Sequence, residues 1–182
     1  MNLEKLFEIQ GGLDAHIVKE KGLEGQDLLS QKILALQVEL GELANEWRGF
    51  KFWSNDQKPR TAVALTSFHA ARKGETKNSL LEEYVDCLHF ILSIGHEFRH
   101  KGNALELKSM FQIKDDITSQ FNLIFNIVSE DLWNYGEIEE GYGSFIYSFL
   151  ELGEMLGFTQ QQIEEAYLQK NEINHQRQLT GY

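Results

Sequence analysis

Two pairs of acidic residues have the spacing of metal ligands on helices. Glu39 and Glu42 are three residues apart, and Glu83 and Asp86 repeat that spacing further along the chain. Residues i and i+3 lie on the same face of a helix, so each pair presents two carboxylates side by side. If the two helices face each other, four carboxylates meet and their mutual repulsion favours a bound cation. Oxygen ligands at this density suit Mg²⁺ or Mn²⁺.

A single acidic pair is weak evidence, because solvated helix faces often carry one. The surroundings of these two pairs strengthen the prediction. Glu39 borders an apolar seam, and Asp86 lies inside the largely apolar run 84–92. An unpaired carboxylate in such a run would be costly. We therefore expect a metal site built by two packed helices.

A polar stripe near the end of the chain suits a phosphorylated ligand. Tyr167, Lys170, Asn174 and Arg177 step by three, four and three residues along one helical face. Lysine and arginine side chains bind phosphate oxygens, and an asparagine amide can both donate to and accept from a base edge or a sugar hydroxyl. The alternative is a solvated basic face at a helix end.

A third motif, His96-Glu97-Phe98-Arg99-His100, fits the H-E-x-x-H pattern of zinc hydrolases. Its setting is unfavourable, because it falls at a helix end, contains an arginine and has no third ligand at a familiar spacing. The other interpretation is that the histidines complement the helix dipole. A zinc hydrolase therefore stays as an alternative function.

Helices must position these side chains. The chain has a single proline, Pro59, so most of it is free to be helical. Apolar residues at helical spacing predict helices over 3–20, 27–47, 79–99, 115–129, 143–156 and 160–179. Capping boxes at Ser79–Glu82 and Thr159–Gln162 mark two helix starts. A short helix is expected at 62–71, and no strand signal is convincing. The sequence predicts an all-α helical bundle.

Composition limits the classes of function. The 182 residues suit one domain, 1–182, and the net charge is −11. Residues 115–169 contain no Lys or Arg and carry 11 acids, so they account for the whole surplus, which disfavours nucleic acid as a partner. No apolar run is long enough to span a membrane, and no signal peptide is visible. A single cysteine, Cys87, suits a reducing compartment, so the expected location is cytoplasmic.

Four segments resemble the dimeric all-α dUTPases, which are relatives of the MazG-type nucleotide pyrophosphohydrolases. Residues 6–14 resemble the family's Q-x-x-L-N/D segment, and residues 39–54 resemble its first metal motif with the trailing F-K-x-W-S. Residues 82–90 resemble the second metal motif. The ending 167–182 is the most specific, with the order K-x-x-L/I-N-x-x-R-Q-x-x-G-Y.

This resemblance implies a homodimeric enzyme that hydrolyses dUTP and dUDP to dUMP and releases pyrophosphate from dUTP. It implies that Glu39, Glu42, Glu83 and Asp86 hold two or more Mg²⁺ ions, with Mn²⁺ as a possible substitute. Metal ions would neutralise the triphosphate and lower the pKa of a bound water. Glu39 or Glu42 would accept the proton of that water, and the sequence does not choose between them.

The expected substrate-binding residues are Gln10, Asp14, Lys51, Trp53, Phe90, Lys170, Asn174 and Arg177. By the resemblance, Lys170 and Arg177 bind phosphates and Asn174 contacts the nucleoside. Gln10 and Trp53 help to form the uracil pocket.

Two further residues complete the set of expected substrate-binding residues. Phe90 lies one helical turn from Asp86 and is a candidate to stack on the base. Asp14 stands where many relatives have asparagine, which leaves its role at uracil open.

Other functions stay open at this stage. A related pyrophosphohydrolase could act on another nucleotide, such as dCTP, or on damaged ones. A non-enzymatic helical partner protein is a third class. Residues 54–78 look like an insertion, whose five cationic side chains would form either a flap over phosphates or a surface loop.

Overall fold

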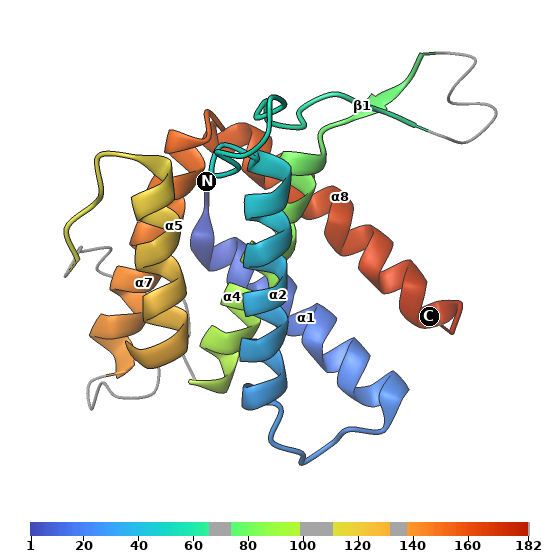
Figure 1. Cartoon of the computed structure of the whole chain (residues 1–182). Helices are drawn as coiled ribbons and strands as arrows, with labels where there is room; N and C mark the ends of the chain where they lie inside the picture. Colours follow the sequence, from blue (N-terminus) through green and yellow to red (C-terminus); the bar gives the residue numbers. More distant parts are fainter. Residues whose placement is uncertain (66–73, 99–110, 132–137, 182) are drawn as a thin grey trace.

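A computed structural model describes residues 1–65, 74–98, 111–131 and 138–181 (Figure 1). These ranges contain the helices α1 (Leu3–Lys21), α2 (Leu29–Trp47), α4 (Ser79–Glu97), α5 (Ile117–Asn126), α7 (Ile138–Met155) and α8 (Gln160–Leu179). A π-helical turn, Ile127–Asp131, continues α5. The described residues thus form an all-α domain, as the sequence predicts. None of their helices combines the length and the apolar character needed to cross a bilayer.

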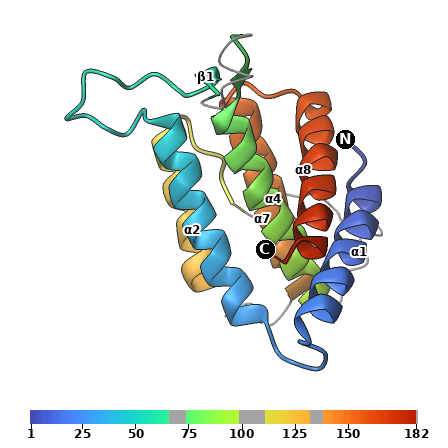
Figure 2. The same ribbon diagram turned by 90° about the vertical axis from the view of Figure 1, so that its right-hand side faces the viewer.

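Helix α4 is the centre of the bundle. It packs against α1, α2, α7 and α8, and α5 lies beside α7 and also contacts α2 (Figures 1 and 2). Its side chains are buried on more than one face, among them Tyr84, Leu88 and Ile91. The sequence shows this as a helix that is apolar on both sides, which is typical of a buried helix. Helices α1, α2 and α8 therefore all present side chains to α4.

Polar residues begin the helices, with one correction to the prediction. The Thr159–Gln162 capping box of α8 is present in full. For α4, however, the N-cap is Asn78, whose side chain accepts from the backbone N–H of Leu81 at 3.0 Å, and Ser79 is already helical. The predicted start was one residue too late, because asparagine caps as well as serine does and stands directly before it.

The segment between α2 and α4 also differs from the prediction. Val63–Ala64 (β1) pairs antiparallel with Thr76–Lys77 (β2), so the expected helix over 62–71 is wrong at its start. The rest of that expected helix, from residue 66, lies outside the described residues. Strands of two residues are too short to show alternation in a sequence. Figure 1 shows the hairpin extending away from the bundle.

Two helical glycines permit close packing by tyrosine rings. A Cβ atom on Gly95 of α4 would lie 2.2 Å from the hydroxyl oxygen of Tyr142, which donates to the carbonyl of Ile91. Gly153 of α7 faces Tyr84 in the same way, at 2.5 Å. Both tyrosine rings are buried, so a methyl group added at either glycine would have to displace a ring.

We expect Gly95→Ala to lower the free energy of unfolding by about 1–3 kcal/mol, because the added methyl group overpacks the core. The matched variant is Gly12→Ala in α1, where the added Cβ would meet nothing within 4 Å beyond the adjacent backbone of its own helix. That change is expected to stabilise by about 0.5–1 kcal/mol through helix propensity. Urea denaturation of both variants measures the difference, and equal effects would contradict the packing contact.

Candidate active site

Three acidic side chains converge between α2 and α4. Glu39, Glu83 and Asp86 each offer a carboxylate oxygen, and these oxygens lie within 4.8 Å of one another. Glu42 is more exposed and lies outside this group, although its charge acts on both Glu39 and Glu83. The structure thus brings together three of the four predicted metal ligands and keeps the fourth at their edge.

Burial and mutual repulsion raise the pKa values of this cluster. The pKa of Glu39 rises to about 7, first through burial and then through the charges of Asp86 and Glu42. The pKa of Glu83 also rises to about 7, for the same reasons. The pKa of Asp86 is raised by burial, against the opposing hydrogen bond from Lys170. The cluster is short of positive charge and offers only oxygen ligands, so it fits a hard divalent cation.

Lys170 supplies the positive charge nearest to the cluster. Its Nζ lies 2.5 Å from Asp86 Oδ2 and 3.4 Å from Glu82 Oε1. Helix α8 reaches this position because it packs along α4. A lysine held beside a cluster of carboxylates that could hold a cation is well placed to bind a phosphate oxygen.

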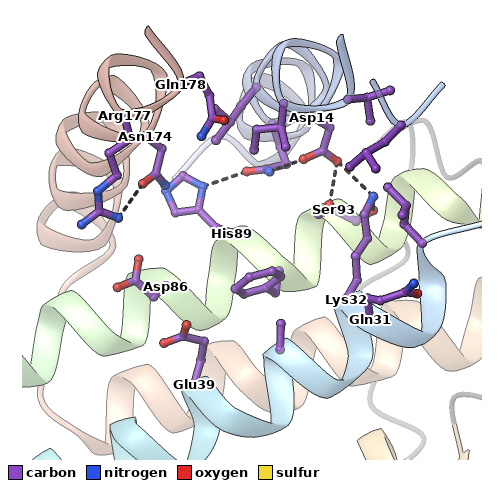
Figure 3. Close-up of a pocket in the computed structure, with 18 of the residues that line it drawn as sticks. Asp14, Gln31, Lys32, Glu39, Asp86, His89, Ser93, Asn174, Arg177 and Gln178 are labelled. Atoms are coloured by element: carbon purple, nitrogen blue, oxygen red, sulfur yellow. Dashed lines mark hydrogen bonds and ion pairs between the residues drawn. The ribbon is translucent and has the colours of Figure 1, made fainter. Parts of the chain in front are cut away.

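A cavity of about 700 Å³ extends along α4 from the carboxylate cluster. Its lining includes Glu39 and Asp86 at one end. Five of the predicted substrate-binding residues line it as well, namely Gln10, Asp14, Phe90, Asn174 and Arg177. Figure 3 shows that they come from different helices, with Asp14 on α1 and Asn174 and Arg177 on α8. Arg177 donates to Asn174 Oδ1 at 3.2 Å, which orients the amide.

Gln10 is the centre of a buried hydrogen-bond chain. Its Oε1 lies 2.8 Å from both His89 Nδ1 and the hydroxyl of Tyr167, and its Nε2 donates to Asp14 Oδ1 at 2.7 Å. The His89 ring stacks on the Tyr167 ring with centroids 4.1 Å apart. Burial, followed by the charge of Lys170, lowers the pKa of His89 to about 3. His89 is therefore neutral at physiological pH.

Two residues at the far end of the cavity were not anticipated from the sequence. Ser93 Oγ donates to Asp14 Oδ2 at 2.6 Å, and Lys32 Nζ lies 3.5 Å from the same oxygen. Lys32 also forms an ion pair with Glu97. A sequence signal existed, because Lys32 lies two helical turns before Glu39 on the same face. These contacts hold the side chain of Asp14 at the end of the cavity opposite the carboxylate cluster.

Lys51 and Trp53 do not line this cavity. Both lie in the loop after α2, where Lys51 Nζ stands 5.6 Å above the Phe50 ring. Trp53 is 65% exposed and contacts the edges of Phe50 and Phe52. The expected roles of Lys51 and Trp53 as substrate-binding residues therefore stay predictions.

The histidine motif does not converge on a metal among the described residues. His96 Nε2 lies 2.8 Å from the carbonyl oxygen of Phe7, to which it donates. Glu97 is paired with Lys32, and His100 lies outside the described residues. The described part of the motif packs helix α4 against α1.

The chain was compared with known proteins. A family model described as dUTPase matches residues 2–69 and 68–182, which together span nearly the whole sequence. A search of curated proteins returned no match to the chain. The family match agrees with the helical architecture and with the motifs that resemble this family in the sequence. The chain belongs to the all-α dUTPase family and is a hydrolase of the dUTP diphosphatase class.

Proposed function

We propose that the protein hydrolyses dUTP and dUDP to dUMP with Mg²⁺, and that it releases pyrophosphate from dUTP. One observation carries this proposal: Glu39, Glu83 and Asp86 converge at one end of the nucleotide-sized cavity, with Lys170 beside them. Negatively charged metal ligands next to a cationic side chain suit a metal–triphosphate complex. Mn²⁺ is the expected substitute ion, because it accepts the same oxygen ligands.

The proposed ligands are Glu39, Glu42, Glu83 and Asp86, and the raised pKa values of Glu39 and Glu83 support this set. When bound, divalent ions would neutralise the triphosphate and lower the pKa of a coordinated water. The four side chains would hold the ions between α2 and α4. A carboxylate oxygen of Glu39 or Glu42 is proposed to accept the proton of the attacking water.

The lining of the cavity supports a proposed orientation for the nucleotide. Lys170 and Arg177 are proposed to bind the phosphates at the carboxylate end, and Asn174 the nucleoside. The base would then reach toward Asp14, and Phe90, which also lines the cavity, would stack on it. A carboxylate can accept from the N3–H of uracil, and neutral cytosine lacks that proton.

Two broader features belong to the same proposal. A homodimer is supported by the exposed apolar side chains of α2 and the following loop: Leu34, Val38, Phe52 and Trp53 are 51–87% exposed. A cytoplasmic location is supported by the free thiol of Cys87.

A nucleotide panel tests the proposed function. Purified protein is assayed with Mg²⁺ and equal concentrations of dUTP, dUDP, dCTP, dTTP and UTP, and products are resolved by ion-exchange chromatography. We expect dUMP and pyrophosphate from dUTP, with kcat/KM at least about a hundredfold above that for dCTP, since a mismatched base leaves buried polar groups unpaired. A preference for dCTP would contradict the proposed substrate. Turnover that persists in EDTA, or that needs bound zinc, would contradict the proposed metal.

A further inference from the structure

Lys170 lies between two carboxylates of α4, and one of them stands outside the carboxylate cluster. Its Nζ is 2.5 Å from Asp86 Oδ2 and 3.4 Å from Glu82 Oε1. Residues i and i+4 share one face of a helix, so Glu82 and Asp86 both project toward α8. Asp86 belongs to the group of described residues that could share a cation, whereas Glu82 does not. The lysine is thus paired both with a proposed metal ligand and with a second carboxylate.

A second lysine fixes the position of Glu82. Lys77 Nζ, at the end of strand β2, lies 2.7 Å from Glu82 Oε2, so the two oxygens of this carboxylate face different lysines. The four charges alternate in sign, in the order Lys77, Glu82, Lys170 and Asp86. Because Lys77 also holds Glu82, this carboxylate offers Lys170 a partner whose position does not depend on Asp86.

The ion pair between Lys170 and Asp86 opposes metal binding. A divalent cation held by Asp86 would lie close to the lysine ammonium group, and like charges at short distances repel. With Asp86 as its sole partner, Lys170 would lose a largely buried ion pair whenever a cation took that carboxylate, which is unfavourable. Glu82 reduces this penalty, because the ammonium group keeps a charged partner.

We propose that Glu82 is a positioning residue for Lys170, which keeps the ammonium group at the phosphate end of the cavity when a metal ion binds Asp86. This inference rests on the proposed function, since it assumes a divalent ion at Asp86 and a phosphate at Lys170. The alternative is that Glu82 acts only as an acid in the first turn of α4, where it favours the helix start. That role predicts no coupling between Glu82 and Lys170 in metal binding.

Metal titration of the nucleotide-free protein tests the coupling. Electron paramagnetic resonance counts unbound Mn²⁺ and so gives its dissociation constant, and circular dichroism confirms that each variant is folded. We expect Glu82→Gln to weaken Mn²⁺ binding by about three- to fivefold, the scale of a partly exposed ion pair, because Lys170 then stays on Asp86. Lys170→Met should bind Mn²⁺ about tenfold more tightly than the wild type, because the competing charge is gone.

The double variant distinguishes an effect through Lys170 from a direct effect of charge. In the Lys170→Met background, Glu82→Gln should change the Mn²⁺ affinity by less than about twofold, since no lysine is left to position. A carboxylate that acted directly on the metal ion would give the same weakening in both backgrounds. Glu82→Asp keeps the charge and should recover part of the affinity in the wild-type background.

Glu46→Gln is the matched control for the loss of one carboxylate. Glu46 lies on α2 and pairs with Arg60 at 3.6 Å. It makes no contact with Lys170 among the described residues, so the variant should bind Mn²⁺ within about twofold of the wild type.

The wild-type protein offers a second readout that needs no variant. An ammonium group that is buried and ion-paired exchanges its protons slowly enough to be followed by nitrogen-15 NMR of labelled lysine. Lys170 is 12% exposed, so we expect its signal in the metal-free protein. Adding Mg²⁺ should shift this signal without removing it, because Glu82 still holds the group. Loss of the signal through exchange with water would show that Glu82 does not hold it.

The outcomes separate the two proposals. A wild-type protein that binds no Mn²⁺, or that does not hydrolyse dUTP, contradicts the proposed function. A wild type that does both, with an equal effect of Glu82→Gln in the presence and absence of Lys170, overturns the inference alone. Unchanged Mn²⁺ binding in Glu82→Gln or in Lys170→Met overturns it as well. If Glu82→Gln does not fold, the Mg²⁺ titration of the wild type decides.

Discussion

Replacing Glu83 by glutamine is expected to abolish dUTP hydrolysis and to raise the stability of the metal-free protein. The pKa of Glu83 is about 7 because the side chain is partly buried and faces Asp86, Glu42 and Glu39. Glutamine has the same shape without the charge, so it relieves the repulsion. We expect kcat/KM to fall at least about a hundredfold, since losing even an outer partner of a metal ligand costs 10–100-fold. The free energy of unfolding should rise by roughly 1 kcal/mol after allowance for solvent screening.

The gain in stability of Glu83→Gln over the wild type should increase as the pH rises. The folded protein holds the Glu83 proton more tightly than the unfolded chain does, whose pKa is near the ordinary 4.5. Wild-type stability therefore falls as the pH rises from about 4.5 to 7, and Glu83→Gln escapes this loss. The melting temperature of the variant should match that of the wild type near pH 4.5 and exceed it by about 2–4 °C above pH 7. Calorimetry in EDTA measures this.

Glu8→Gln is the matched control, because it removes an exposed carboxylate of α1 far along the sequence from both acidic pairs. It is expected to change neither turnover nor melting temperature. If Glu83→Gln were active, the proposed ligand set would be wrong. If it were inactive and less stable, repulsion among the carboxylates would not be the dominant interaction at this site.

The sequence predicts those parts of the site that depend on helix periodicity. The spacing of Glu83 and Asp86 places both on one face of α4, and the apolar seam of α2 turns Glu39 toward them. The stripe of α8 likewise brings Asn174 and Arg177 to the cavity, since one face of a regular helix is set by residue spacing alone.

Other parts of the site depend on how helices meet. Lys32 and Ser93 acquire their role only because α1 brings Asp14 between them. The buried hydrogen-bond chain at His89 depends on Gln10 and Tyr167, which are 157 residues apart in the chain. No local pattern encodes such contacts. The sequence shows only that a histidine stands in an apolar run, which is equally typical of a structural core residue.

The loop after α2 illustrates a third case. Arg48 ends the helix with a positive φ of 66° and donates to the carbonyl oxygen of Asp56 at 2.7 Å. Arginine seldom adopts this conformation, so the helix end was visible only as a break in periodicity. The exposed position of Trp53 follows from this loop and not from the helix pattern that predicts its neighbours.

Lys170→Met is expected to lower activity for a different reason than Glu83→Gln and to have the opposite effect on stability. Lys170 and Asp86 form a largely buried ion pair, with side chains 12% and 17% exposed. Removing the lysine leaves Asp86 unpaired beside Glu39 and Glu83. We expect a loss of about 2–3 kcal/mol at pH 8, somewhat below the range for fully buried pairs. Loss of a charged contact to phosphate should lower kcat/KM by roughly ten- to a hundredfold.

The pH dependence and the double variant identify the cause. Lys170 now opposes the rise in the pKa of Asp86, so its removal raises that pKa further above the ordinary 3.8. The stability lost in Lys170→Met should therefore return as the pH falls and Asp86 takes up a proton. Adding Glu83→Gln to Lys170→Met should restore part of the stability at pH 8 but no activity, because it removes one of the charges that repel Asp86. Additive effects in urea denaturation would show instead that the lysine acts independently of the carboxylate cluster.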